Sequence, residues 1–189
     1  MPLSLVAAPT LEPISIAEAR AQCRVDGNDE DGLIAGYVLA ARDYVETYTR
    51  RALMTQTWDQ IGNCLVNEIV LKKPPIQSVT SVKYLDGSGV EQTLAPSQYR
   101  IVRRDTGEYV IVPAYGVTWP TPQAVEGAVT VRFVAGYGAA PSNVPEAIRQ
   151  ALLILVAHLY AIREPVVTGT IVSEVPLSVD TLLFPHRAF

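Results

Sequence analysis

The strongest hydrophobic pattern in the chain lies in residues 144–162, VPEAIRQALLILVAHLYAI. One stripe at helical spacing contains Ile148, Leu152, Leu155 and Leu159, and most other sides carry Leu153, Ile154, Val156 and Tyr160. A helix that is apolar all round needs burial all round. The apolar run is only about a dozen residues long and His158 interrupts it, whereas a membrane span needs roughly twenty. We therefore expect this helix to lie inside a larger core or under a neighbouring subunit.

Three further helices are predicted, at residues 16–23, 30–49 and 178–184. Ser15 followed by Glu18 has the spacing of a capping box, which predicts the start of the first helix. In the second helix the apolar and aromatic residues recur every three or four positions, at Ile34, Tyr37, Val38, Ala41, Tyr44, Val45 and Tyr48. Its expected solvent side consists of Arg42, Asp43, Glu46 and Arg50. For the helix at 144–162, Asn143 and Glu146 are the expected capping residues, with Pro145 in the first turn.

Between residues 55 and 137 the hydrophobic period changes towards two, and Gly, Pro and Asp recur about every ten residues. This pattern predicts seven strands, at residues 55–61, 68–71, 79–85, 90–94, 99–103, 109–112 and 128–134. In the last of these we expect Val129, Val131 and Phe133 to face inward, and Thr130 and Arg132 to face out. Short Gly-containing turns between consecutive strands favour antiparallel pairing. The pattern therefore predicts an α+β protein in which a mostly antiparallel sheet lies between the second and third helices.

The composition places further limits on this picture. The chain has 189 residues, of which 49% are hydrophobic and 18% charged, and its formal net charge is −4. These values are typical of a folded protein with a real core, and no shift in composition divides the chain, so we expect one domain over residues 1–189. The acidic balance and the lack of basic clusters argue against sequence-specific nucleic-acid binding.

Neither a signal peptide nor a disulfide framework is expected. The N-terminus has no basic region followed by a long apolar run, so the chain should stay in the compartment where it is made. Cys23 and Cys64 have no metal-like spacing, and we expect both to be reduced and packed as small hydrophobic residues.

The sequence contains no convincing catalytic, cofactor or metal motif. The two histidines, His158 and His186, have no acidic or thiol partner next to them in sequence. The segment 136–138 lacks the remaining residues of a phosphate-binding loop. The acidic turn at 26–31 lacks the spacing of a calcium loop, so its acids are interpreted as turn and cap residues. A dispersed enzyme site built from Asp29, Arg42, Tyr44 and His158 remains as an alternative.

Several stretches in order along the chain resemble phage head-to-tail connector proteins of the small adaptor type. They are ISIAEARAQCRVDGNDEDGLIAGYVLAARDYVETYTRRALMTQTWD, LKKPPIQSVTSVKYLDGSGVEQTL, VTVRFVAGYG, VPEAIRQALLILVAHLYAIRE and SEVPLSVDTLLFPHR. The resemblance rests on their order and spacing and covers nearly the whole chain. It implies a helical bundle of connector type with a β-rich insertion between the second and third helices. The insertion, at residues 55–137, is large relative to minimal, all-helical connectors.

The resemblance also implies a structural role without catalysis or cofactors. Copies would form a ring, dodecameric by analogy, that docks on the portal protein of the head and presents a surface for a downstream neck or tail protein. The protein would be made in the bacterial cytoplasm and reside in the virion neck, without membrane contact. Alternatives are another neck or tail-completion protein, the dispersed enzyme, or a monomeric binding module.

We expect the helix faces within residues 37–48 and 148–162 to form core and subunit contacts. Residues 166–175 are rich in β-branched side chains, which suits an arm that adds a strand to another chain. The residues predicted to contact another copy or a partner are Ile154, Tyr160, Val166, Val167, Ile171 and Val172.

Overall fold

The computed structural model describes residues 1–162 and 176–188, and the chain in it forms two compact units. The β-rich unit contains residues 1–9 and 55–137, and the helical unit contains residues 10–54 and 138–187. Each unit is therefore built from two separate stretches of the chain. The expectation of one domain over residues 1–189 stays a prediction.

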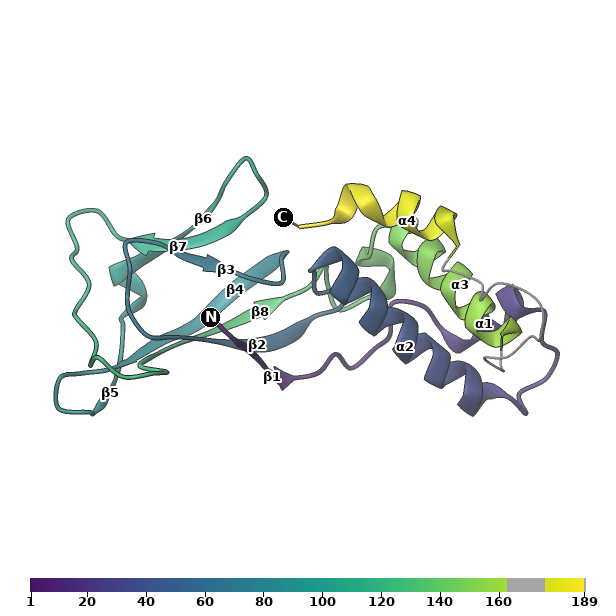
Figure 1. Ribbon diagram of the computed structural model, residues 1–189, viewed down its shortest axis with the longest axis horizontal. Coiled ribbons are helices and arrows are strands. Elements are labelled where there is room, and N and C mark those ends of the chain that lie inside the picture. Colours follow the sequence, from purple (N-terminus) through teal and green to yellow (C-terminus); the bar gives the residue numbers. More distant parts are fainter. Residues whose placement is uncertain (163–175, 189) are drawn as a thin grey trace, which may run out of the picture. The chain divides into compact units, whose positions relative to one another are not determined.

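The helical unit consists of four α-helices, whose colours in Figure 1 show that they come from both ends of the chain. They are α1 (Ile16–Cys23), α2 (Asp31–Thr49), α3 (Glu146–Ala161) and α4 (Leu177–Leu183). The short 3₁₀ helices η2 (Pro141–Asn143) and η3 (Phe184–His186) flank α3 and α4. These bounds lie within two residues of the predicted ranges.

The core of the helical unit lies where α3 packs against α1, α2 and α4. The side of α2 that faces this core is the predicted stripe, with Ile34, Val38, Ala41 and Val45 buried. Helix α3 contributes Ile148, Ala151, Leu152, Leu155 and Val156. Because α3 has three helical neighbours within its own subunit, its unusually wide apolar surface is largely explained by packing inside the unit.

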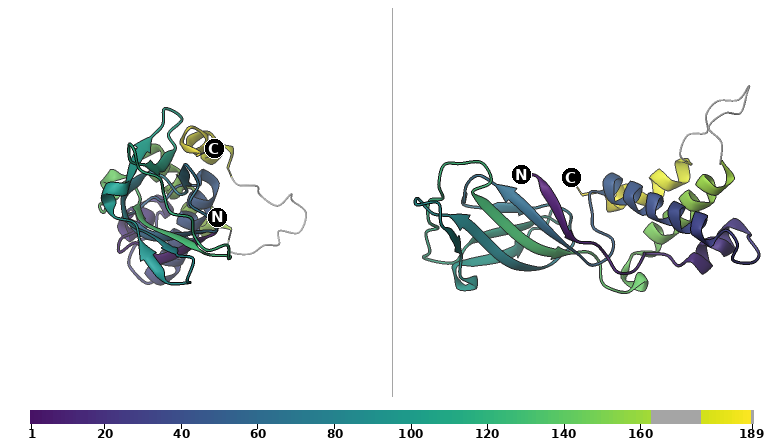
Figure 2. Two further views of the ribbon diagram at one scale, coloured as in Figure 1. Left: turned by 90° about the vertical axis from the view of Figure 1, so that its left-hand side faces the viewer. Right: turned by 90° about the horizontal axis from the view of Figure 1, so that it is seen from below.

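The β-rich unit contains two antiparallel sheets rather than the one sheet expected (Figure 2). The five-stranded sheet has the order β1 (Leu3–Ala7), β2 (Gln56–Gly62), β8 (Val129–Ala135), β4 (Ile76–Leu85) and β5 (Glu91–Thr93). The three-stranded sheet has the order β3 (Ile69–Leu71), β7 (Tyr109–Pro113) and β6 (Tyr99–Arg103). The combination of four helices with antiparallel sheets confirms the α+β class.

The central strand β8 shows the predicted alternation. Val129, Val131 and Phe133 are fully buried, whereas Arg132 is exposed on the other face. Arg132 lies opposite Asp59 of β2 and donates two hydrogen bonds of 2.8 Å to its carboxylate. The period-two pattern therefore identified both the strand and its orientation.

Other local predictions are wrong. Strand β1 was not expected, because the sequence LSLVA lacks a sustained alternation. In the structure its last four residues are exposed, and the strand is held by pairing with β2. Asn143 does not cap α3. Its side chain accepts a 3.1 Å hydrogen bond from the backbone N–H of Ala140, and α3 begins after Pro145. A Cβ atom at Gly138 would lie 2.3 Å from Asn143 Oδ1, so only glycine fits beside this turn.

Two side chains also differ in burial from expectation. Glu46 was assigned to the solvent side of α2 but is buried. Its Oε1 accepts a 2.8 Å hydrogen bond from the backbone N–H of Leu53, which explains how a charged group tolerates this position. Both cysteines are free as expected, but Cys64 is exposed rather than packed.

Candidate assembly surface

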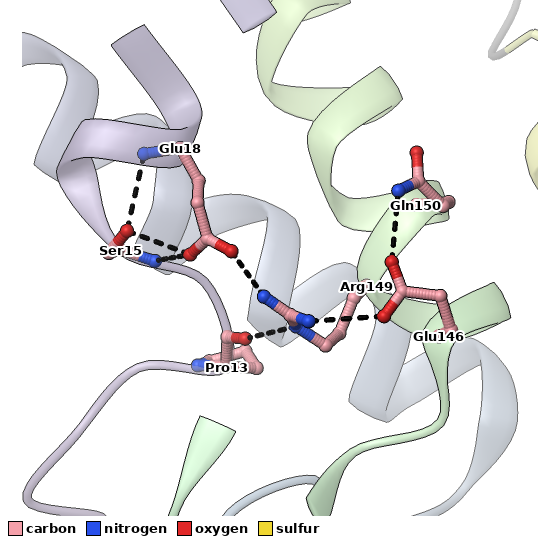
Figure 3. Close-up of polar contacts among 6 residues, drawn as sticks. All are labelled: Pro13, Ser15, Glu18, Glu146, Arg149 and Gln150. Atoms are coloured by element: carbon pink, nitrogen blue, oxygen red, sulfur yellow. Dashed lines mark hydrogen bonds and ion pairs between the residues drawn. The ribbon is translucent and has the colours of Figure 1, made fainter. Parts of the chain in front are cut away.

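The segment that leads into α1 is fixed by a capping box. The backbone N–H of Ser15 donates to Glu18 Oε2 at 2.7 Å, and the N–H of Glu18 donates to Ser15 Oγ at 3.2 Å (Figure 3). The hydrogen bond from the Ser15 backbone is the main reason why the pKa of Glu18 lies below its ordinary value. The spacing of Ser15 and Glu18 predicted this arrangement, and the structure confirms it.

Arg149 of α3 ties the same segment to the third helix. Its guanidinium donates to the carbonyl of Pro13 at 3.3 Å, to Glu146 at 3.1 Å and to Glu18 (Figure 3). Because Glu146 and Arg149 are three residues apart on α3, they form a local ion pair. Sequence reasoning did not find this cluster, since it joins residues more than a hundred positions apart.

A groove lies beside this anchor, between the segment before α1 and the first half of α2. It has a volume of about 380 Å³ and is almost entirely apolar. Its lining is formed by Leu11, Glu12, Ile14, Ser15, Ile16, Ala35, Val38, Leu39 and Pro141. Three of its apolar residues, Leu11, Ile16 and Leu39, are exposed.

Glu12 is the charged residue of the groove. Its Oε1 accepts a 2.6 Å hydrogen bond from Arg42 of α2, while Oε2 is buried without a hydrogen-bond partner among the described residues. Burial raises the pKa of Glu12 above its ordinary value, and the positive charge of Arg42 partly offsets this effect. A carboxylate in this position marks one end of an otherwise apolar surface.

On α3 the structure places both predicted contact residues in partly exposed positions. Ile154 lies away from the buried stripe, and the hydroxyl of Tyr160 donates to Glu30, which precedes α2. Neither placement tests subunit contact, which stays a prediction. The other predicted contact residues, Val166, Val167, Ile171 and Val172, lie outside the described residues.

Helix α4 has a second apolar surface that sequence reasoning did not single out. Val179 and Leu183 face the core, whereas Leu177 is 80% exposed and Phe184 is 59% exposed. At the end of this helix, Arg187 lies over the ring of Tyr48 at 5.7 Å, and Arg51 donates a hydrogen bond to the carbonyl of His186. The signal in the sequence was the seven-residue spacing of Leu177 and Phe184, which places them on one side of a helix.

Two residues of the dispersed enzyme site, Arg42 and Tyr44, have separate partners. Arg42 pairs with Glu12, whereas Tyr44 stacks on Tyr48 with ring centroids 6.2 Å apart. Arg42 and Tyr44 are two residues apart on α2, so their side chains point in widely different directions. Within the part of the chain that the structure describes, no cluster of His, Cys, Asp and Glu could hold a metal ion, and no helix is long and apolar enough to cross a membrane.

Comparison with known proteins gives a family match and close structural likenesses. Residues 13–85, from the start of the anchored segment to the end of β4, match the family described as Phage gp6-like head-tail connector protein. Comparison with curated proteins found no match.

Three solved structures match essentially the whole chain, each covering 100% of this chain and 96% of the other. A chain in the neck of an empty gene transfer agent (GTA) particle, computed with C6 symmetry, has a TM-score of 0.82 and 26% identity. A chain in the virion of a native GTA particle has a TM-score of 0.80 and 27% identity. A chain in the neck of a native GTA particle, computed with C12 symmetry, has a TM-score of 0.76 and 24% identity, a likeness that concerns the fold. Residues 13–85 therefore match the phage head-tail connector family, and the whole chain is similar to two GTA chains at 26% and 27% identity.

Proposed function

We propose that this protein is a structural component of the neck of a phage-like particle, where copies of it form a ring that joins the head to the tail. The observation that carries the proposal is the likeness over the full chain to a neck protein, at a TM-score of 0.82 and 26% identity. A neck computed with C6 symmetry accommodates rings whose copy number is a multiple of six. This includes the dodecamer implied by the sequence resemblance.

The partners in this proposal are other copies of the chain, a portal protein on the head side and a downstream neck or tail protein. The helices form the connector-type bundle, and the β-rich unit is an elaboration that faces outward or towards the tail. The acidic net charge of −4 supports a channel without tight DNA binding, because each phosphate neutralised by Lys or Arg would strengthen retention of the DNA.

We further propose that the role is non-catalytic and requires no cofactor. The support is that the side chains of the dispersed enzyme site have other partners, Glu12 for Arg42 and Tyr48 for Tyr44. The stacking lies within α2, and the ion pair ties α2 to the segment before α1, so both side chains have structural contacts.

The contact residues Ile154 and Tyr160, and the arm at residues 166–175, remain part of the proposal. An Ile154→Asp variant should keep its fold, because the residue is partly exposed, and should lose assembly. The matched control is Leu155→Ala, since Leu155 is buried and the substitution should lower stability instead. If Ile154→Asp unfolds the subunit, as judged by circular dichroism, this face belongs to the core.

The test of the function is assembly with and without purified portal protein. Analytical ultracentrifugation and negative-stain electron microscopy should show a cyclic oligomer that caps the portal. A ring that binds only a tail component would instead favour a tail-completion protein. A species that stays monomeric at high concentration and with portal present would contradict the proposal.

A further inference from the structure

Two apolar surfaces of the helical unit lie on opposite flanks of α2. Ala35 lines the groove, whereas Tyr44 lies on the side of α4. These residues are nine positions apart, or about two and a half turns, so their side chains point in opposite directions about the helix axis. Tyr44 lies close enough to α4 for the charge of Asp180 to act on its phenol. The pKa of Tyr44 is raised, first by burial and then by this negative charge.

The surface on the α4 side is a projection. Leu177 and Phe184 are seven residues apart, which places them on the same side of the helix, about 10 Å apart along its axis. Their exposed fractions of 80% and 59% mean that their own subunit covers little of either side chain. Thr181 lies between them, and its hydroxyl donates to the carbonyl of Leu177 at 3.0 Å, so this intervening polar group is already satisfied.

The surface on the other flank is a recess. The groove has a volume of about 380 Å³, and its rim is formed by Leu11, Ile16 and Leu39. An apolar cavity of about 150 Å³ is sufficient to hold a benzene ring. The groove therefore has room for a Phe side chain together with a Leu side chain.

We propose that the groove of one copy receives Leu177 and Phe184 of the neighbouring copy, and that this is one head-to-tail contact of the ring, in addition to any made by Ile154 and Tyr160. The inference rests on the proposed ring function and names the surfaces that form it. In a cyclic ring each copy contacts its neighbours through two unlike patches, whereas a twofold dimer pairs one patch with itself. A recess and a projection on opposite flanks of one helix fit the first arrangement.

The charges at the two surfaces are complementary. At the groove, the carboxylates of Glu12 and Asp43 share the guanidinium of Arg42, which leaves one net negative charge. Near the end of α4, the guanidinium groups of Arg187 and of Arg51, which follows α2, outweigh the carboxylate of Asp180 and leave one net positive charge. In the proposed contact these opposite charges favour one orientation of the neighbouring copy and disfavour the reverse.

Disulfide cross-linking tests the contact directly. We would introduce Leu39→Cys and Leu177→Cys into one chain in which Cys23 and Cys64 are replaced by Ser, assemble rings and oxidise them. Non-reducing electrophoresis should show a ladder of linked copies. Each single-cysteine variant, and a chain with Leu39→Cys and Val125→Cys, should remain unlinked. Val125 is a suitable control because it is exposed on the β-rich unit.

Charge substitution gives a second, independent measurement. Leu39→Asp and Phe184→Asp should each raise the concentration needed for assembly at least about tenfold, which corresponds to a modest loss of contact energy. Val125→Asp should leave assembly unchanged, and circular dichroism should show native helix content in all three. Rings that form normally with Leu39→Asp and yield no ladder would overturn this contact while leaving the connector function standing. If the unmodified chain forms no ring even with portal protein, both proposals are overturned.

Discussion

The two units of this protein differ in how their surfaces are used. The segment 55–137 of the β-rich unit carries seven basic and seven acidic residues, so the excess of acids in the whole chain comes from the helical unit. The helical unit also contains the groove and the exposed residues of α4. Both units satisfy charges locally, through pairs such as Arg132 with Asp59 in the β-rich unit and Arg149 with Glu18 in the helical unit. In the proposed ring contact, the excess negative charge and the contact surfaces lie in the same unit, the helical one.

The largest expected effect is a core truncation in each unit. Phe133→Ala in β8 should lower the free energy of unfolding by about 3–5 kcal/mol, because a fully buried ring is replaced by a cavity. Leu155→Ala in α3 should cost about 2–5 kcal/mol for the same reason. Urea unfolding followed by circular dichroism and Trp fluorescence measures both.

This pair of variants also tests the single-domain prediction. If the units unfold together, each substitution shifts one common transition. Two separate transitions, each sensitive to only one of the two variants, would show that the units are independent domains.

The next effect concerns buried polar side chains, one in each unit. Glu46 of α2 accepts from the N–H of Leu53, and Gln60 of β2 donates to the carbonyl of Val70 and accepts from the N–H of Lys72. Glu46→Ala and Gln60→Ala should each cost about 1–3 kcal/mol, because backbone groups lose their hydrogen-bond partners. Glu46→Gln retains an acceptor oxygen and should cost less. Equal losses for the Ala and Gln variants at position 46 would argue against this hydrogen bond as the cause.

A smaller effect is expected at the start of α1. Ser15→Ala removes the side-chain cap of Glu18 and should lower stability by about 0.5–2 kcal/mol. Ser15→Asp retains an acceptor for the N–H and serves as the matched control. Thermal unfolding of the two variants should place the Asp variant closer to the unmodified protein.

The smallest effect is the acid dependence that Glu18 contributes. Its pKa is lower in the folded protein than in the unfolded chain, so its contribution is present above the unfolded pKa and is lost as the pH falls through the folded pKa. Glu18→Gln should therefore flatten the loss of stability on acidification. The pKa of Glu12 is raised, so the opposite sign applies to Glu12: acidification removes the cost of burying its charge, which outweighs the weakened pairing with Arg42. A Glu18→Gln variant with an unchanged acid profile would contradict this assignment.

The sequence predicted the elements with strong local signals and missed those that depend on distant partners. The capping box at Ser15, the stripe of α2 and the alternation of β8 all follow from residues close together in the chain. Strand β1 has no such alternation and exists because β2 lies beside it. Glu46 and Gln60 are buried because each meets a backbone group at least seven residues away, which no hydrophobic pattern records.

The candidate assembly surface was predicted less well than the fold. The all-round apolar character of α3 suggested a subunit contact, but its three neighbouring helices account for much of that surface. The groove escaped prediction because its walls come from three separate stretches of the chain, around residues 11–16, 35–39 and 141. Phe184 was within the predicted helix 178–184 and Leu177 just before it, yet their exposure depends on which side of α4 meets the core.

The interleaving of the two units along the chain has a consequence for synthesis on the ribosome. Helix α2 is made early, but α3, which covers its apolar side, follows only after the whole β-rich segment 55–137. A nascent chain therefore contains the groove-forming residues of α2 without the helix that fixes them, and it lacks α4 entirely. In the proposed contact, a chain in which α4 has not yet been made has no projection to insert into a neighbour, so it can accept a neighbouring copy but cannot dock on one.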